Sequence, residues 1–241
     1  MEEPGHDHLT ASAGAMRRRD PAGRLTLGDC LRTFLTHPSP WEIGAALTAS
    51  LVARVMTGHW SWRDPVIAAA LITAQPLTEW VIHVYLLHSK PVRIGRRTFD
   101  LPAAREHREH HAAPADLDQV LIPMPVIALL IPAILLGAFG LGFAIHPLIG
   151  GDRVAGTLTG IVAAFAVLGV YEWTHFLIHT PYVPKRGYYR HIHRSHRLHH
   201  YKNEHYWFGV TSNCGDDVLG TNPDQSGVER SATARALHGE A

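Results

Sequence analysis

Residues 172–200 read EWTHFLIHTPYVPKRGYYRHIHRSHRLHH, and they close a long apolar stretch that begins at Val154. His175 and His179 stand four residues apart at the end of that stretch. Three more histidines follow at i, i+3 and i+4: His196, His199 and His200. Residues three or four apart share a face of a helix, and imidazole is the commonest metal ligand in proteins. The segment therefore predicts one helix end and a second helix that present imidazoles to a metal site.

Two further clusters lie upstream and bring the total to ten of the chain's 19 histidines. They are His83 with His88, and the triplet His107, His110 and His111. We expect each triplet to converge on a single helical face. His83 and His88 are five residues apart, which is a rotation of about 140° on a regular helix, so the two cannot meet one ion there. Either they serve different ions, or His88 lies beyond the helix end.

Four apolar stretches dominate a chain of 241 residues with 46% apolar content: 41–57, 65–87, 120–145 and 154–178. A bilayer core needs about 20 residues of helix, and the last three stretches meet that length. The first is shorter and carries Arg54, which must snorkel or pair with a neighbour unless the helix tilts. The sequence therefore predicts an all-α polytopic membrane protein with four transmembrane helices. A soluble helical bundle is disfavoured because residues 120–145 contain no charge.

Basic residues predict the orientation of these spans, because cytoplasmic loops collect lysine and arginine. Five lie before Trp41, six between His88 and Gln119, and eight after Ile178, which leaves only Arg54, Arg63 and Arg153 for the other side. Both termini and all four histidine clusters are then cytoplasmic, and we expect a helical cap there. The net charge of +1 gives no reason to expect a nucleic-acid partner, and the basic residues near the spans suit contacts with anionic membrane lipids.

The polar ends of the chain suggest its organisation. We expect a disordered cytoplasmic tail over residues 1–24, an integral-membrane domain over 25–220 and a flexible tail over 221–241. Within 25–37, an apolar helical face predicts a helix in the membrane interface, or equally a packed cytoplasmic helix. That face comprises Leu27, Leu31, Phe34 and Leu35, with Asp29, Arg32 and Thr33 pointing away. Cys30 and Cys214 form no metal motif.

The number of imidazoles bears on the metal. Ten ligands over two ions give five each, which is more than zinc usually takes and leaves one position open on an ion that prefers six. That pattern favours two iron ions that activate dioxygen. Zinc binds imidazole more tightly than ferrous iron does, so it can replace iron in purified protein.

The motifs resemble those of the fatty acid hydroxylase/sterol desaturase superfamily from about Leu77 to Thr221. The H-x-x-x-x-H box at His83 follows Glu79-Trp80, and the H-x-x-x-H box at His175 follows Glu172-Trp173. Two H-x-x-H-H boxes, which begin at His107 and His196, complete the set. The eighteen residues between His88 and His107, and the ending Phe208-Gly209-Val210-Thr211, are similar to the fatty acid 2-hydroxylase branch. Carotenoid hydroxylases share the longer first box and the approach Pro184-Lys185-Arg186-Gly187-Tyr188, whereas sterol desaturases have a shorter first box.

This resemblance implies a membrane di-iron oxygenase that hydroxylates an unactivated C–H bond of a fatty acyl chain or other lipid with O2 and two electrons. All ten histidines then bind metal, and the reaction has no catalytic residue beyond the metal centre. A fused cytochrome b5 domain is not found in this sequence, so we expect a separate electron donor, a ferredoxin or a cytochrome b5-like protein with its reductase. Carotenoid hydroxylation and lipid or sterol desaturation on the same site are alternatives.

Four further residues are candidates for supporting roles. Glu79 and Glu172 stand four and three residues before His83 and His175, where a carboxylate can accept the second N–H of a metal-bound imidazole; the alternative is a buried carboxylate paired with an arginine. His193 and His205 border the last box and are expected to support its ligands or to lie on the surface. A metal-ion transporter is the non-enzyme alternative, but transport sites lie near the bilayer midplane rather than at helix ends.

Overall fold

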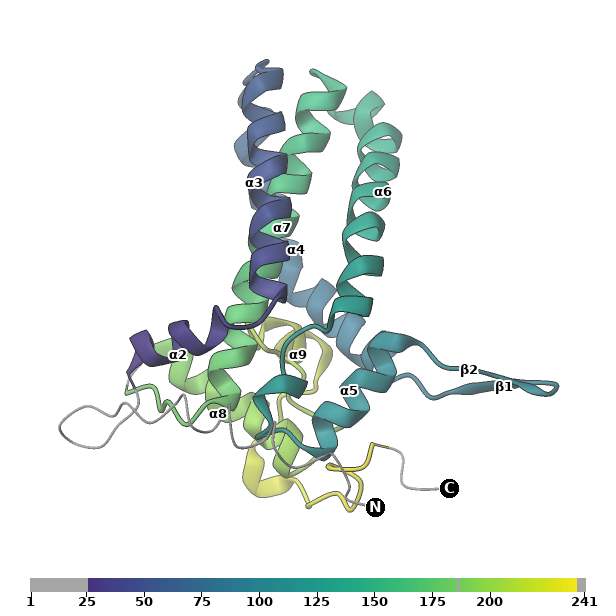
Figure 1. The fold of residues 1–241 in the computed structure, drawn as a ribbon, viewed down its shortest axis with the longest axis vertical. Coiled ribbons are helices and arrows are strands. Elements are labelled where there is room, and N and C mark those ends of the chain that lie inside the picture. The colour runs from purple at the N-terminus through teal and green to yellow at the C-terminus, as the bar shows by residue number, and fades with distance from the viewer. Residues whose placement is uncertain (1–25, 186, 238–241) are drawn as a thin grey trace, which may run out of the picture.

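The computed structural model describes residues 26–185 and 187–237. Four long helices rise side by side as a pillar, and the remaining elements gather below it as a cap (Figure 1). The pillar consists of α3 (Ser39–Thr57), α4 (Arg63–Val81), α6 (Met124–Ile149) and α7 (Arg153–His179). Helix α7 contacts each of the other three. It is therefore the central helix, and its lower end places His175 and His179 at the junction with the cap.

Three segments of the pillar are long and apolar enough to cross a membrane: Arg63–Leu87, Leu117–Ile149 and Arg153–His179. They correspond to three of the four predicted spans. The first predicted span, α3, is not among them because its mean hydropathy is too low, and Glu42 and Arg54 contribute to that. It nevertheless runs alongside α7 (Figure 1), and its role as a fourth span stays a prediction.

Arg54 pairs with neighbouring helices, which was one of the possibilities open for this charge. Its guanidinium is buried and lies 2.7 Å from the Asp64 carboxylate of α4 and 2.7 Å from the Thr159 hydroxyl of α7. The Gly58 carbonyl accepts a third hydrogen bond, and the group stacks over the Trp60 ring. A buried charge is tolerated only when it is paired and hydrogen-bonded. This network joins α3, α4 and α7 at the end of the pillar far from the cap.

Two glycines allow close helix contacts. A Cβ at Gly142 of α6 would lie 2.3 Å from the Thr157 hydroxyl of α7, and a Cβ at Gly215 would lie 2.5 Å from the Pro76 carbonyl of α4. Gly215 belongs to α9 (Cys214–Leu219) of the cap. Its lack of a side chain lets α9 lie directly on α4, which ties the C-terminal part of the cap to the pillar.

The cap contains α2 (Leu27–Phe34), α5 (Pro102–Ala112) and α8 (Gly187–Tyr201), together with α9 and the short 3-10 helices Leu117–Gln119 and Gln225–Gly227. Helix α2 begins at a capping box between Thr26 and Asp29. Its buried residues are Asp29, Cys30, Thr33 and Phe34, whereas Leu27, Leu31 and Leu35 are exposed. The three leucines expected on the apolar face are thus largely exposed, whereas Asp29 and Thr33, which were expected to point away, are buried. The interfacial position of this helix stays a prediction.

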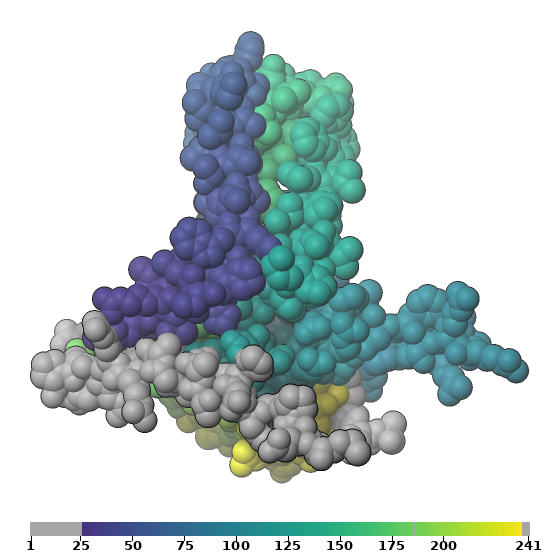
Figure 2. Space-filling model, in the orientation of Figure 1, coloured from purple at the N-terminus to yellow at the C-terminus, as the bar shows by residue number. Residues whose placement is uncertain are grey.

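The all-α prediction missed a small β-hairpin between His88 and α5. Strands β1 (Val92–Ile94) and β2 (Arg97–Phe99) pair antiparallel, and Gly95 adopts a positive φ of 61° in the turn. Glycine reaches this conformation without a steric penalty, as hairpin turns require. The hairpin projects sideways from the cap (Figures 1 and 2).

The C-terminal segment differs from the flexible tail expected over 221–241. Its residues 221–237 lie within the described part of the chain, and Val228, Ala234 and Leu237 are buried there. Hydrogen bonds to the buried Glu204 from the hydroxyls of Ser231 and Thr233 attach the segment to the loop after α8. The small and polar residues of this segment show no helix or strand periodicity in the sequence, yet these hydrogen bonds hold the segment in place. The tail predicted over 1–24 lies outside the described residues, as do 238–241.

Candidate metal centre

The ten predicted histidines form two groups of five at the junction of pillar and cap. The first histidine group comprises His83, His88, His107, His111 and His199. The second histidine group comprises His110, His175, His179, His196 and His200. Within each group, one nitrogen of every ring lies within 4.8 Å of the corresponding nitrogens of the others. Nine of the ten side chains are buried and His88 is half-buried.

Each histidine triplet lies on the buried face of its helix, but its three members divide between the two groups. On α5, His107 and His111 join the first group while His110 joins the second. On α8, His196 and His200 join the second group while His199 joins the first. The two helices meet within each group: the ring centroids of His110 and His200 are 4.6 Å apart, and those of His111 and His199 are 4.9 Å apart. Residues at i and i+4 differ by only about 40° around a helix, whereas i+3 lies about 60° to the other side. Both helices therefore contribute histidines to both groups.

His83 and His88 share the first group despite their five-residue separation. The chain over Ile82–Leu87 is a π-helix, and the His88 amide donates to the His83 carbonyl at 3.1 Å. A π-turn closes after one more residue than an α-turn, so it brings i and i+5 nearer to the same face. His88 is the residue after the last helical one, so it lies beyond the helix end, as one of the two sequence alternatives required. Because both side chains fall in one group, the arrangement favours this alternative over two different ions.

Backbone carbonyls orient the rings of the first histidine group. The Nδ1 atoms of His83, His111 and His199 lie 2.6 Å, 2.9 Å and 2.8 Å from the carbonyl oxygens of Phe208, Ala234 and Tyr206, respectively. A carbonyl only accepts, so each Nδ1 donates its proton and each Nε2 keeps a lone pair for a metal. All three carbonyls come from the chain after α8. The Phe208 ring also lies against His83, His88 and His199 and shields this group.

A different segment orients the second histidine group. The Nδ1 atom of His179 donates to the Pro114 carbonyl at 2.8 Å, and His175 hydrogen bonds to the backbone of Val120. Both partners lie between α5 and α6. The two groups are thus held by two separate irregular segments.

Buried ring nitrogens test whether these residues fit a metal. Among the described residues, no hydrogen-bond partner is found for the buried Nε2 atoms of His111, His175, His179 and His199 or for either nitrogen of His110. The Nε2 atoms of His83 and His107 face each other at 3.1 Å, as do those of His196 and His200. Unsatisfied buried polar atoms are costly, and lone pairs that converge are stabilised by a cation between them. The residues present therefore fit a metal ion in each group.

Burial also favours the ligand form of the cap histidines. Desolvation, followed by the effect of neighbouring histidines, holds the pKa of His107, His110, His196, His199 and His200 well below the ordinary value. Desolvation lowers the pKa of His111 to about 4, against the opposing effect of its bond to Ala234. Neutral imidazole is the metal-binding form. These rings are ready to bind metal at neutral pH.

Glu79 and Glu172 contact the orienting segments rather than the imidazoles. Glu79 accepts hydrogen bonds from the amides of Val210 and Thr211, from the Thr211 hydroxyl and from Gln75. Glu172 accepts from the Ser39 hydroxyl at 2.6 Å and from the Ile122 amide at 2.9 Å. No hydrogen bond to a histidine or arginine is found for either carboxylate among the described residues. Glu79 thus fixes the chain beside Phe208, and Glu172 fixes the chain beside Val120.

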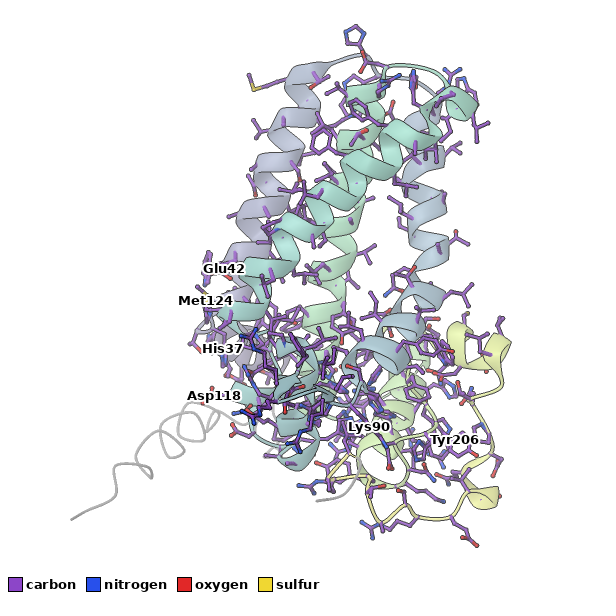
Figure 3. All side chains as sticks on the ribbon, turned by 90° about the vertical axis from the view of Figure 1, so that its right-hand side faces the viewer. His37, Glu42, Lys90, Asp118, Met124 and Tyr206 are labelled. Atoms are coloured by element: carbon purple, nitrogen blue, oxygen red, sulfur yellow. The ribbon has the colours of Figure 1, made fainter. Side chains whose placement is uncertain are left out.

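His193 and His205 belong to neither group. His193 is buried against Tyr189, with the ring centroids 6.4 Å apart, and desolvation lowers its pKa to about 4. His205 is exposed beside Glu204. In Figure 3 the neighbouring Tyr206 lies in the lower part of the cap, whereas Glu42 and Met124 mark where α3 and α6 leave it. Sequence analysis missed the carbonyls of Pro114, Tyr206, Phe208 and Ala234, because a backbone oxygen has no side-chain signature.

An apolar cavity of about 370 Å³ adjoins both groups. It is lined at one end by His83, His107, His110 and His175, and it continues between α4, α6 and α7 to Leu71, Ile134 and Ala164. His83 lies twelve positions after Leu71, which corresponds to about 18 Å along a helix. The cavity therefore leads from the histidines into the part of the molecule that can lie in a membrane.

Comparison with known proteins gives a consistent assignment. A family model described as "Fatty acid hydroxylase" matches residues 68–221. A fatty acid 2-hydroxylase of Macaca fascicularis is 31% identical over 143 residues, which cover 58% of this chain and 35% of the relative. A dihydroceramide fatty acyl 2-hydroxylase of Arabidopsis thaliana is 28% identical over 156 residues, 64% of this chain and 61% of the relative. The chain thus spans between about a third and three fifths of these relatives.

A solved structure has a similar fold. It is described as "Full length scs7p (only hydroxylase domain visible)", with a TM-score of 0.55, 23% identity, and coverage of 79% of this chain and 64% of that one.

Proposed function

The chain belongs to the fatty acid hydroxylase family, and we propose that it hydroxylates an unactivated C–H bond of a fatty acyl chain with O2 and two electrons. The similarity to fatty acid 2-hydroxylases places it in that branch, and the carbon next to the acyl carbonyl is therefore the proposed position. The observation that carries the proposal is the pair of five-histidine groups at the end of an apolar cavity.

The ten histidines are proposed to hold two ions, one in each group. Five imidazoles leave one position open on an ion that prefers six ligands, which favours iron over zinc, and zinc is expected to replace it in purified protein. Bound iron would supply the reduction of O2. The protein orients the rings through backbone carbonyls and keeps them neutral by burial. The Phe208 ring, which lies against His83, His88 and His199, keeps water away from the first histidine group.

The cavity supports an acyl substrate. Its walls are mostly apolar, and it extends from the histidines between α4, α6 and α7. An acyl chain that lies along these helices would keep its polar end at the cap and its first methylenes beside the histidines. This arrangement supports oxidation near the acyl carbonyl.

We place α3 as the fourth span and both termini, with the histidine groups, on the cytoplasmic side. Support comes from the 19 basic residues that the predicted topology assigns to that side, against Arg54, Arg63 and Arg153 on the other. The burial of Arg54 against Asp64 removes the main obstacle to α3 as a membrane helix.

The electron donor is proposed to dock on the outer face of α8. Arg190, Arg194 and Arg197 are exposed there at i, i+4 and i+7, while the inner face carries three histidines that divide between both groups. A helix is only about 10–12 Å across, so a carrier bound to this face comes close to both. A basic face suits an acidic partner, which fits a ferredoxin or a cytochrome b5-like protein.

The test is to make the protein in iron-replete cells and to measure its metal content, its O2 uptake and the lipid products by mass spectrometry. Two metal equivalents and a mass gain of one oxygen atom on an acyl chain are expected. His200→Ala is the control and should abolish the product. Loss of two hydrogens instead would indicate desaturation, and metal flux in vesicles without oxidised product would contradict the proposal.

A further inference from the structure

The β-hairpin has no evident role in holding metal or in closing the cavity. All six residues of β1 and β2 are exposed. It extends away from both pillar and cap in the ribbon and in the space-filling view (Figures 1 and 2). A two-stranded hairpin alone is marginally stable in water, so a projecting hairpin with large exposed apolar side chains indicates a binding surface.

The register gives the hairpin one apolar face. Val92 pairs with Phe99, and Ile94 pairs with Arg97, so these four side chains share a face. Val92, Ile94 and Phe99 are 57%, 64% and 55% exposed. Arg93 and Thr98 lie on the opposite face.

Positive charge surrounds these apolar side chains. The segment between His88 and Asp100 contains four basic residues and no acidic one: Lys90, Arg93, Arg96 and Arg97. Apolar side chains beside lysine and arginine are typical of elements that lie in a membrane interface, because the apolar groups enter the acyl boundary while the cations meet anionic headgroups.

The position of the hairpin agrees with that environment. It leaves the cap at the height of α5, a little below α2 on the opposite side, and both project to the side (Figure 1). Helix α2 exposes Leu27, Leu31 and Leu35. The hairpin is also joined on both sides to the apolar cavity, since Leu87 precedes it, Ala103 follows it, and both line the cavity.

We propose that the β1–β2 hairpin is a membrane-surface anchor that binds anionic lipid. Val92, Ile94 and Phe99 enter the boundary between headgroups and acyl chains, and the four basic residues contact the anionic headgroups. Anchoring holds the Leu87 and Ala103 side of the cavity against the bilayer. The proposal needs the chain to lie in a membrane but does not depend on the oxidation chemistry.

The first experiment measures depth in the bilayer with a nitroxide on each face of the hairpin. The full chain with C214S, which removes the exposed cysteine, carries the label through V92C or T98C. It is reconstituted into bilayers of phosphatidylcholine with phosphatidylserine. The label at 92 should collide several-fold more often with O2 than with a water-soluble nickel complex, and the label at 98 should show the reverse. Equal access of the nickel complex to both positions would overturn the proposal.

The second experiment tests the charge. In R93E/R97E, the label at position 92 should lie less deep in the bilayer. The same shift is expected for the unchanged hairpin in bilayers of phosphatidylcholine alone. R190E/R194E makes the same change of charge on α8 and is the matched control; it should leave the depth unchanged. If the hairpin is buried only after an acidic protein is added, its partner is a protein and the lipid proposal is overturned. A chain that forms no hydroxylated product but shows the expected depths would leave this proposal standing.

Discussion

The two histidine groups have the same number of imidazoles but are supported by different parts of the chain. In the first group, His83, His111 and His199 donate to carbonyls of the C-terminal segment after α8. In the second, His175 and His179 are bonded to the chain between α5 and α6. Each segment is in turn tied to one buried glutamate, Glu79 for the first group and Glu172 for the second. The difference teaches that ligand geometry is set by irregular chain, and that each group can be disturbed on its own.

The largest effect is expected from replacing consecutive histidines. H199A should remove the metal of the first group and H200A that of the second, because neighbours on α8 face different groups. Each variant should keep about one metal equivalent, and hydroxylation should fall by at least about 100-fold in both, since loss of a ligand exceeds the effect of losing its supporting partner. Metal analysis gives the number of ions that each variant binds, and a spectrum of the remaining ion shows whether the two variants keep different ions. Loss of the same ion from both variants would show that the division is wrong.

Shortening the C-terminal segment should weaken one group only. Deletion of 229–241 removes the Ala234 carbonyl and the Arg235 bonds to the carbonyls of His111 and Ala112. Metal affinity of the first group should fall by about 10–100-fold while the second retains its ion. Competition with a chelator measures both affinities.

Deletion of 238–241 alone is the matched control and should retain both ions. If the longer deletion does not fold, S231A/T233V removes the hydroxyls bonded to Glu204 and should give a smaller loss at the first group. An equal loss from both groups would contradict separate support.

The two glutamates provide a reciprocal test. Both oxygens of Glu79 accept hydrogen bonds, so the NH2 group of E79Q must face either the amides of Val210 and Thr211 or the Gln75 amide and the Thr211 hydroxyl. We expect about a 10-fold loss of affinity in the first group. At Glu172 a single oxygen accepts from both Ser39 and Ile122, which a glutamine could replace, so E172L is the variant that should do the same in the second group. Chelator competition on both variants should show opposite selectivity, and matching profiles would refute the assignment.

The smallest effect is expected for His193, which lies in neither group. In metal-free protein, its protonation contributes to the pH dependence of stability. Its pKa of about 4 in the folded chain is below the ordinary value of about 6.5 because it is desolvated. As the pH falls below 6.5 the unfolded chain takes up this proton first, so stability is lost. The loss should be about 1 kcal/mol at pH 6 relative to pH 8.

H193F should remove that part of the pH dependence. Thermal unfolding of metal-free protein in detergent between pH 8 and pH 6 measures it. At pH 8 the two proteins should differ only through packing. Parallel pH slopes for both would show that His193 is not the group involved.

Sequence analysis predicted what depends on side-chain identity and periodicity. The ten histidines come together in space, three of the predicted spans are long and apolar enough to cross a membrane, and the histidines at i and i+4 share a group. The division of each triplet could not be predicted, because it depends on which histidines of α5 and α8 face each other.

Other features depend on contacts that leave no pattern in the sequence. The carbonyl of Ala234 orients His111 across 123 residues of chain, and nothing in the polar segment around it suggests this. The hairpin was missed because strands of three residues are shorter than any reliable alternation. The pairing of Arg54 with Asp64 was one of several possibilities, and only the proximity of α3 to α4 decides among them.

The π-turn at Ile82–Leu87 has a consequence for the history of such proteins. A π-turn is what results when a single residue is inserted into an α-helix and the flanking turns keep their hydrogen bonds. A first box with three intervening residues on an α-helix and one with four on a π-turn can thus present the same pair of imidazoles. Insertion or deletion of one residue at this point would then leave both imidazoles facing the same group.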